Sequence, residues 1–208
     1  LKAARTEVDR CIFTFTVAAE EATRLQGEYL SLDWQEFTAG RWGIVRRFPL
    51  GPVAGITPFN FPLNLVAHKV APAMAAGCPV LVKPAPQTPF TALALGEVIL
   101  KAGWPEEALA VMPLDNAETC WLAEKEERIK LLSFTGSVKV GWELKAHSGR
   151  KRVLLELGGN AALIVHNDWP DLDDAAARTA RAAFSYAGQS CISVQRVFVA
   201  RSVFQTFL

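Results

Sequence analysis

Several features that assign many sequences to a functional class are missing from this chain. It contains neither the GxGxxG dinucleotide fingerprint nor a Walker A loop, so neither common phosphate-binding loop applies. Its four cysteines and three histidines are widely spread and show neither a CxxC pair nor a cysteine–histidine metal spacing, so no metal site is expected. A net charge of +1 gives no reason to expect nucleic acid or an anionic membrane as a partner.

Long uninterrupted apolar segments are missing as well. Residues 48–67 carry no charge, but four prolines interrupt them and exclude a single membrane-spanning helix. The N-terminus shows no apolar core followed by a small-residue cleavage site, so no signal peptide is expected. We therefore expect reduced thiols in a cytoplasmic protein, although the even number of cysteines would permit disulfides.

What is present indicates a globular protein with a sizeable core, since 50% of its 208 residues are hydrophobic and 21% are charged. Apolar positions at helical spacing predict a helix over residues 1–27. Aromatic residues with basic flanks predict a β-hairpin arm over residues 31–50 that pairs with something else. Because the chain lacks an initiating methionine and stops where a new amphipathic segment begins, we expect it to be a piece of a longer polypeptide.

From residue 53 onward, short apolar runs alternate with helical patterns. The expected strands cover residues 53–57, 79–82, 108–112, 129–134, 153–157, 161–165 and 194–199. The expected helices cover residues 63–76, 88–102, 116–127, 138–146 and 172–186. Short apolar strands separated by helices predict an α/β fold, a parallel Rossmann-like sheet with helices on both faces. The double glycine at residues 158–159 is interpreted as a hinge to a second α/β unit.

Polar side chains follow several of these expected strands. Asn60, Lys83, Ser137 and Glu156 each come at or just after the end of an apolar run. Ligands of an open parallel sheet bind outside the carboxyl ends of its strands. We therefore expect these four residues to face one crevice.

Each of these residues has a structural interpretation beside a functional one. Ser137, which follows Gly136, suits a helix N-cap or a pyrophosphate site at the helix N-terminus. Lys83 is either a surface lysine whose stem covers apolar residues or an ammonium that donates to ribose hydroxyls or phosphate. Asn60, in a turn between two prolines, is either a turn residue or an amide donor aimed at an oxyanion.

Glu156 and Cys191 complete the set of candidates. A carboxylate in so apolar a run is costly unless it is paired with a basic residue or has a functional role, and burial would raise its pKa toward that of a useful general base. Cys191 is either structural or a nucleophilic thiolate. The other three cysteines are less well placed for that role, because two belong to expected helices and one to a Gly-Cys-Pro turn.

Taken together, five segments resemble the NAD(P)-dependent aldehyde dehydrogenase superfamily, in order and in spacing, over essentially the whole chain. They are GITPFNFP at residues 55–62, VLVKPA at 80–85, FTGSVKVG at 134–141, LELGGN at 155–160 and GQSC at 188–191. The resemblance implies an enzyme that oxidises an aldehyde to a carboxylic acid with hydride transfer to NAD or NADP. It also implies the roles of individual residues.

In the reaction that the resemblance implies, Cys191 attacks the carbonyl to form a thiohemiacetal, and a thioester follows after hydride transfer. Asn60 Nδ2 and the Cys191 backbone N–H stabilise the oxyanion, and Glu156 activates the water that hydrolyses the thioester. Lys83 is similar to the lysine that binds the adenosine ribose. The remaining cofactor contacts that the resemblance implies are Gly136 and Ser137 at the pyrophosphate, and Thr57, Pro58, Phe59 and Leu157 along the cofactor path.

The resemblance also implies the domain organisation. Residues 1–30 and 51–158 correspond to the NAD(P)-binding domain, residues 31–50 to an oligomerisation hairpin, and residues 159–208 to the start of the catalytic domain. Family members are much longer and hold the rest of the substrate funnel, so this chain alone is expected to be inactive. The full-length protein is expected to be a homo-oligomer, a dimer or a tetramer, that acts on a small-molecule aldehyde.

Two positions depart from the family pattern. The family has a second ribose contact three residues after the lysine, often Glu, and Pro86 stands there in this chain. Losing the carboxylate removes a repulsion against a 2′-phosphate, so we expect NADP to be tolerated. The loop after the third strand usually contains glycine but is MPLD at residues 112–115, so adenine packing is expected to differ.

Two alternatives stay open. A CoA-acylating semialdehyde dehydrogenase would resolve the thioester with CoA instead of water, and the retained Glu156 argues against it. A catalytically incompetent fragment, or a binding module of the same fold, is the other alternative. Retention of Cys191, Glu156, Asn60 and Lys83 opposes a non-catalytic protein, whereas the expected truncation of the chain favours it.

Overall fold

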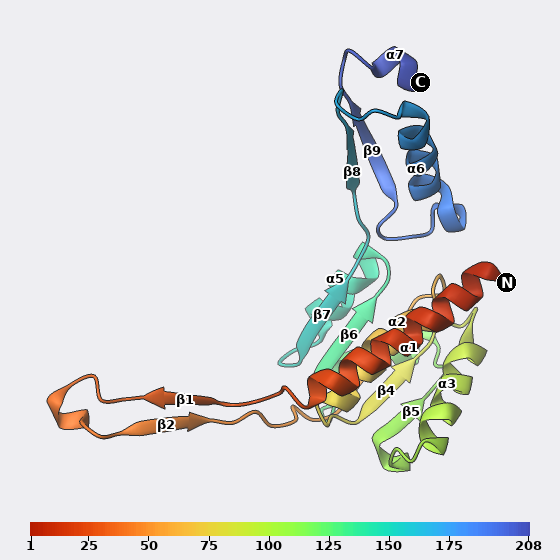
Figure 1. The fold of residues 1–208 in the computed structure, drawn as a ribbon. Coiled ribbons are helices and arrows are strands. Elements are labelled where there is room, and N and C mark those ends of the chain that lie inside the picture. The colour runs from red at the N-terminus through yellow and green to blue at the C-terminus, as the bar shows by residue number, and fades with distance from the viewer. The chain divides into compact units, whose positions relative to one another are not determined.

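The computed structural model describes the backbone of residues 1–208 and every side chain except that of Asn116. The chain forms two compact units, and Figure 1 labels most of their helices and strands. Unit 1 comprises Leu1–Thr135 and Gly141–Leu155, and unit 2 comprises Gly136–Val140 and Glu156–Leu208.

Unit 1 is built on a five-stranded sheet with the strand order β5-β4-β3-β6-β7. The strands are β3 (Val53–Ile56), β4 (Val80–Lys83), β5 (Leu109–Val111), β6 (Leu131–Thr135) and β7 (Arg152–Glu156). The helices are α1 (Lys2–Ala22), α2 (Asn64–Ala75), α3 (Pro89–Lys101), α4 (Asn116–Glu124) and α5 (Val138–His147), with a short 3-10 helix η2 (Glu106–Ala108). β3 is parallel to β4 and β6, and β4 is parallel to β5. The predicted parallel sheet between helices is confirmed.

Successive side chains of each strand point to opposite sides of the sheet, and both faces of the sheet are apolar. On one face Val53 and Val82 pack with Val70 of α2 and Ile99 of α3, and all four are buried. On the other face Leu122 of α4 is buried beside the strands. Burying a side chain of this size contributes about 1.5–3 kcal/mol, which explains why strands that read as continuous apolar runs sit between helix layers.

Residues 24–50 form an arm with its own two-stranded sheet, drawn in orange in Figure 1. The strands β1 (Glu28–Ser31) and β2 (Trp42–Val45) are antiparallel, with the 3-10 helix η1 (Glu36–Thr38) in the connection. The predicted hairpin is therefore present, but its first strand begins before residue 31. Gly27 directly precedes this strand, and a Cβ there would lie 1.9 Å from the Val45 carbonyl oxygen. Only glycine lets the backbones on the two sides of the hairpin approach so closely at that point.

Unit 2 restarts the α/β pattern after the double glycine, as predicted. Strands β8 (Ala161–Val165) and β9 (Val194–Val199) are parallel and are joined through α6 (Leu172–Phe184) and the 3-10 helix η3 (Ser185–Gly188). A short helix α7 (Phe204–Phe207) follows. Asp171 caps α6, since its side chain accepts a hydrogen bond from Asp174 N at 2.9 Å. Nowhere in the part of the chain that the structure describes is a helix both long and apolar enough to cross a membrane.

Candidate functional site

The carboxyl ends of β3 and β4 lie side by side at one edge of the unit 1 sheet. Ile56 is level with Lys83 in the parallel register, and Thr57 N donates a hydrogen bond to the Lys83 carbonyl at 3.1 Å. Both polar side chains are buried, with exposed fractions of 4% for Thr57 and 5% for Lys83. Among the described residues, Thr57 Oγ1 has no hydrogen-bond partner.

The Lys83 ammonium occupies an unfavourable place for a charge. Burial lowers the pKa of Lys83 from its usual value, and the nearby carboxylate of Asp115, the N-cap of α4, opposes that shift. Lys83 takes part in none of the ion pairs among the described residues. The surface interpretation of Lys83 is therefore wrong, and a buried cation of this kind favours a ligand that can accept its hydrogen bonds.

Asn60 lies in the turn that joins β3 to α2. Its side chain is half-buried, and its Oδ1 accepts a hydrogen bond from Phe61 N at 3.1 Å. Because the amide oxygen is turned toward the backbone, the Nδ2 donors point the other way. Pro58 is half-buried beside it, and Phe59 is 41% exposed.

The N-terminus of α2, just after this turn, is held by a residue of α1. Glu7 Oε1 accepts hydrogen bonds from Leu63 N at 2.8 Å and from Asn64 N at 3.0 Å. The N-cap residue Leu63 offers no side-chain acceptor, so Glu7 supplies the missing cap and a favourable charge at the positive end of the helix dipole. Sequence reasoning missed Glu7, because no local pattern links it to a helix that begins 57 positions later.

In unit 2, Gly136 and Ser137 precede the first turn of α5. Gly136 N donates a hydrogen bond to the Glu156 carbonyl at 3.0 Å, which joins the two predicted site segments. Ser137 Oγ accepts a long hydrogen bond of 3.4 Å from Val140 N. Ser137 therefore makes the contact of an N-cap, whereas its role at a pyrophosphate stays a prediction.

The expectation that an apolar run buries Glu156 is wrong. The side chains of β7 alternate between exposed and half-buried, and Glu156 is exposed. Glu156 shares one face of β7 with Arg152 and Leu154, which are also exposed, whereas Val153 and Leu155 on the opposite face are half-buried. Glu156 also takes part in none of the ion pairs among the described residues, so structural pairing does not explain it. Leu157, the next residue, is half-buried.

Cys191 lies in the turn between η3 and β9, where its thiol is free and exposed. Ser193, which is buried, closes this turn. Its N donates to the Ser190 carbonyl at 3.1 Å and its Oγ donates to the Gly188 carbonyl at 3.5 Å. Gln195 Nε2 in turn donates to Ser193 Oγ at 2.6 Å. Sequence reasoning missed the hydroxyl of Ser193, and its place two residues after the cysteine is the only signal that could have found it.

The backbone just before Cys191 is strained. Tyr186 and Ala187 have left-handed φ angles of 57° and 55°. This conformation costs about 1 kcal/mol or more for each residue that is not glycine. Strain of this kind persists where the surroundings enforce it, and it concentrates at functional loops.

The other three cysteines differ in accessibility. Cys11 and Cys78 are buried, and burial together with the nearby Glu7 carboxylate raises the pKa of Cys11. Cys120 is exposed on α4 of unit 1. Within the described residues, no group of three or more histidine, cysteine or acidic side chains could hold a metal ion.

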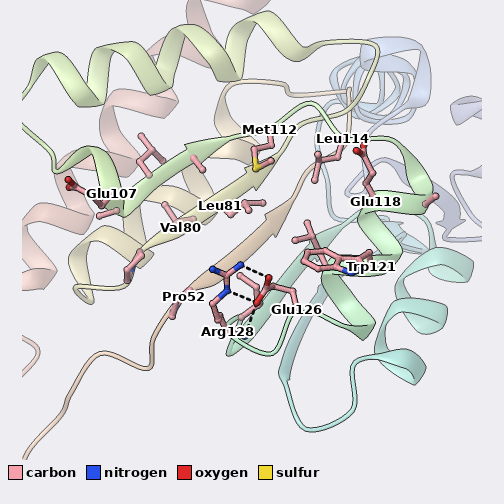
Figure 2. Close-up of a pocket in the computed structure, with 17 residues that line it drawn as sticks. Pro52, Val80, Leu81, Glu107, Met112, Leu114, Glu118, Trp121, Glu126 and Arg128 are labelled. Carbon is pink, nitrogen blue, oxygen red and sulfur yellow. Dashed lines mark hydrogen bonds and ion pairs between the residues drawn. The ribbon is translucent and has the colours of Figure 1, made fainter.

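A cavity of about 790 Å³ lies beside α4 in unit 1, away from the predicted chemistry (Figure 2). Leu81 of β4, Met112 of the loop after β5 and Trp121 of α4 contribute to its apolar walls. Arg128 and Glu126 also line it and form an ion pair of 2.7 Å, and the hydrogen bonds from Arg128 lower the pKa of Glu126 to about 2. None of the predicted site residues lines this cavity.

The predicted site residues divide between the two units. Unit 1 brings together the turn at residues 57–60 and Lys83, and unit 2 brings together Gly136 with Glu156 and holds Cys191. Asn60 belongs to unit 1 and Cys191 to unit 2, so their meeting at one reacting carbonyl stays a prediction.

Comparison with known proteins covers the whole chain. A family model described as "Aldehyde dehydrogenase family" matches residues 1–208. The chain is 42% identical over 209 aligned positions to 3-sulfolactaldehyde dehydrogenase of Priestia aryabhattai, covering 100% of this chain and 43% of that protein.

Solved structures agree with this match. The crystal structure of aldehyde dehydrogenase 21 from Physcomitrella patens, in complex with the reaction product succinate, is 47% identical with a TM-score of 0.93, and the match covers 99% of this chain and 43% of that one. Glyceraldehyde-3-phosphate dehydrogenase GapN from Methanocaldococcus jannaschii, complexed with NADP, is 36% identical with a TM-score of 0.90, covering 99% and 44%. The chain thus spans less than half the length of these relatives.

Proposed function

The chain belongs to the aldehyde dehydrogenase family, and we propose that the protein that carries it oxidises an aldehyde to a carboxylic acid with NAD or NADP. The observation that carries this proposal is the free, exposed thiol of Cys191, held in a turn that the segment just after Glu156 contacts. A nucleophilic thiol beside a general base is the combination that covalent aldehyde oxidation needs. The activity is proposed for the whole protein, because this chain spans less than half the length of its relatives.

The proposed reaction begins when the Cys191 thiolate attacks the aldehyde carbon and forms a carbon–sulfur bond. Donors from Asn60 Nδ2 and the Cys191 backbone N–H stabilise the resulting oxyanion. When bound, a nicotinamide cofactor would supply the oxidising power by accepting hydride from the same carbon, which would leave the acyl group on Cys191 as a thioester. Glu156 takes a proton from a water molecule, which attacks the thioester, releases the acid and returns the thiolate.

The orientation of Asn60 supports its part in this scheme. Its Oδ1 is engaged by Phe61 N, so the end of the amide that leaves the turn carries hydrogen-bond donors, as an oxyanion requires. The turn is rigid, since Pro58 and Pro62 flank it and Glu7 holds the helix that follows. Preorganised donors stabilise an oxyanion more than donors that must first be ordered.

The residues present fit a dinucleotide cofactor. The orphaned hydroxyl of Thr57 and the buried ammonium of Lys83 are adjacent polar groups that ribose hydroxyls would pair with. Gly136 and Ser137 precede the N-terminus of α5, where a pyrophosphate would be favoured by the helix dipole. The further residues assigned to the cofactor path are Pro58, Phe59 and Leu157.

The choice between NAD and NADP depends on Pro86. Pro86 is exposed three residues after Lys83 and cannot repel a 2′-phosphate, as a carboxylate in that place would. The relative from Methanocaldococcus jannaschii is complexed with NADP, which agrees with tolerance of the phosphate. Comparing turnover with the two cofactors tests this, and a strict preference for NAD would contradict it.

The organisation of the chain supports three further proposals. Residues 1–30 and 51–158 form the cofactor-binding domain and residues 159–208 begin the catalytic domain. The arm, which includes the predicted hairpin at residues 31–50, contributes to a homo-oligomer, because its exposed apolar side chains need a partner surface. A cytoplasmic location is supported by four cysteines that are all free.

Substitution of two exposed cysteines tests the proposed function. In the full-length protein, Cys191→Ser should abolish aldehyde-dependent formation of NADH or NADPH, while Cys120→Ser should leave it unchanged. The aldehyde panel would begin with 3-sulfolactaldehyde, which the name of one relative gives, and with succinate semialdehyde, whose oxidation product succinate is bound in the structure of another. Oxidation by Cys191→Ser at the unaltered rate would contradict the proposal, and turnover that requires CoA would favour the CoA-acylating alternative.

A further inference from the structure

Gly159 lies against the backbone of the nucleophile. A Cβ added to Gly159 would stand 2.3 Å from the Cys191 carbonyl oxygen and 3.5 Å from its carbonyl carbon. Real Cβ atoms essentially never lie within 3.0 Å of a nonbonded heavy atom, so the 2.3 Å distance to the oxygen leaves no space for a methyl group unless the backbone shifts. Both residues belong to unit 2, and Gly159 is the third residue after Glu156.

Glycine is needed at position 159 because a side chain would not fit there, and not because the φ angle is left-handed. Gly188 and Gly149 have left-handed φ angles of 73° and 57°, which side chains rarely adopt, but Gly159 has no such angle. Any residue could therefore take the backbone conformation of Gly159, and only the close approach of Cys191 excludes a side chain.

The neighbouring glycine lacks this restriction. A Cβ on Gly158 would meet Val138 Cγ2 at 3.8 Å, which is an ordinary van der Waals contact. Gly158 also has no left-handed φ angle. Gly158 and Gly159 therefore provide a matched comparison. Alanine at Gly159 would clash with the Cys191 backbone, whereas alanine at Gly158 would not.

We propose that Gly159 is a positioning residue for the nucleophile: its missing side chain lets the segment after Glu156 pack on the Cys191 peptide and fixes the thiol and the backbone N–H. Ser193 holds the same turn from its other side, through Gly188 and Gln195. The turn needs such anchors, because Cys191 and Ile192 are themselves exposed. The catalytic meaning of this geometry rests on the proposed function, whereas the contact itself does not.

Alkylation of cysteines in the full-length protein tests the proposal without aldehyde or cofactor. Wild type, Gly159→Ala and Gly158→Ala are treated with iodoacetamide over about pH 6 to pH 10, and the rate at each cysteine is followed by peptide mass spectrometry. We expect Gly159→Ala to change the alkylation rate of Cys191 by about tenfold at one or more pH values in this range. Gly158→Ala should leave the rate unchanged at every pH. Cys120, which is also exposed, should react alike in all three proteins.

Three results would overturn the proposal. One is a Cys191 rate and pH profile in Gly159→Ala equal to those of the wild type. Another is rapid alkylation of the buried Cys11 and Cys78 in that variant, because Gly159 would then serve only the stability of the fold. The third concerns Ser193→Ala, which removes the other anchor without adding an atom, and in which an unchanged Cys191 rate would show that the turn does not govern the thiol.

Failure of the positioning role of Gly159 can be distinguished from failure of the proposed function. If Cys191→Ser still oxidises aldehydes, the proposed nucleophile is wrong, yet the alkylation rates still decide whether Gly159 positions Cys191. If Cys191→Ser is inactive and Gly159→Ala alkylates normally, the nucleophile stands and the positioning role falls.

Discussion

The charge on Lys83 is unfavourable in the folded chain, which makes a ligand role testable. Lys83→Met keeps a long unbranched side chain and removes a buried ammonium whose pKa burial lowers. We expect Lys83→Met to be at least as stable as the wild type, while cofactor affinity of the full-length protein falls by about 10- to 100-fold. Titration calorimetry with NAD and NADP measures the affinity. An unchanged affinity would contradict the ribose-binding role.

The same substitution gives a pH dependence with a defined sign. At low pH, lysine is charged in both the folded and the unfolded chain, so the desolvation of Lys83 opposes folding fully. As pH rises through the lowered folded pKa toward the usual 10.5, the folded chain loses its proton first and this penalty fades. The wild type should therefore gain stability relative to Lys83→Met over that range. Lys101→Met, at an exposed lysine, is the control and should show no such gain.

Pro86 is expected to control the tolerance of NADP. Placing a carboxylate there with Pro86→Glu would repel the 2′-phosphate of NADP and could accept hydrogen bonds from the ribose hydroxyls of NAD. We expect kcat/KM for NADP to fall at least about tenfold relative to that for NAD. Steady-state kinetics of the full-length protein check this ratio. A ratio that does not change would remove the residue from cofactor selection.

At the level of elements, Glu7 links α1 to the start of α2. Glu7→Ala leaves Leu63 N and Asn64 N without their acceptor and removes a charge that favours the helix N-terminus. We expect the free energy of unfolding to fall by about 1–2 kcal/mol, as for other lost helix caps. Urea unfolding measures it, with Glu20→Ala on the exposed part of α1 as control. Equal losses in both variants would show that the cap contributes nothing specific.

Most elements could be predicted from the sequence because their signals are local. Apolar runs, helical spacing and the prolines and glycines between them place every strand of the unit 1 sheet within a few residues of its observed bounds. The exposure of Glu156 could not be predicted this way, because it depends on which face of β7 the rest of the chain covers. The contact of Gly159 with Cys191 joins residues far apart in the chain, and the motif alone shows only that the glycine is there.

At the level of the whole molecule, the arm predicts an assembly. Trp42 and Ile44 of β2 are 56% and 62% exposed in this chain, and an isolated two-stranded sheet is marginally stable in water. Replacing both with serine in the full-length protein should dissociate the oligomer, since each buried side chain of this size contributes about 1.5–3 kcal/mol. Light scattering after size-exclusion chromatography measures the mass. Phe90→Ser, an exposed aromatic residue on α3, is the control, and an unchanged mass in the arm variant would contradict the proposed role.

In the proposed reaction, Cys191 carries the acyl group and Glu156 brings about its release. Mixing full-length Glu156→Gln with aldehyde and cofactor should give one rapid equivalent of NADH or NADPH per active site, because thioester formation proceeds while hydrolysis stalls. Mass spectrometry of the quenched protein should then find the acyl group on the peptide that contains Cys191. Steady turnover by Glu156→Gln at the wild-type rate, or an acyl group on any other residue, would contradict the account.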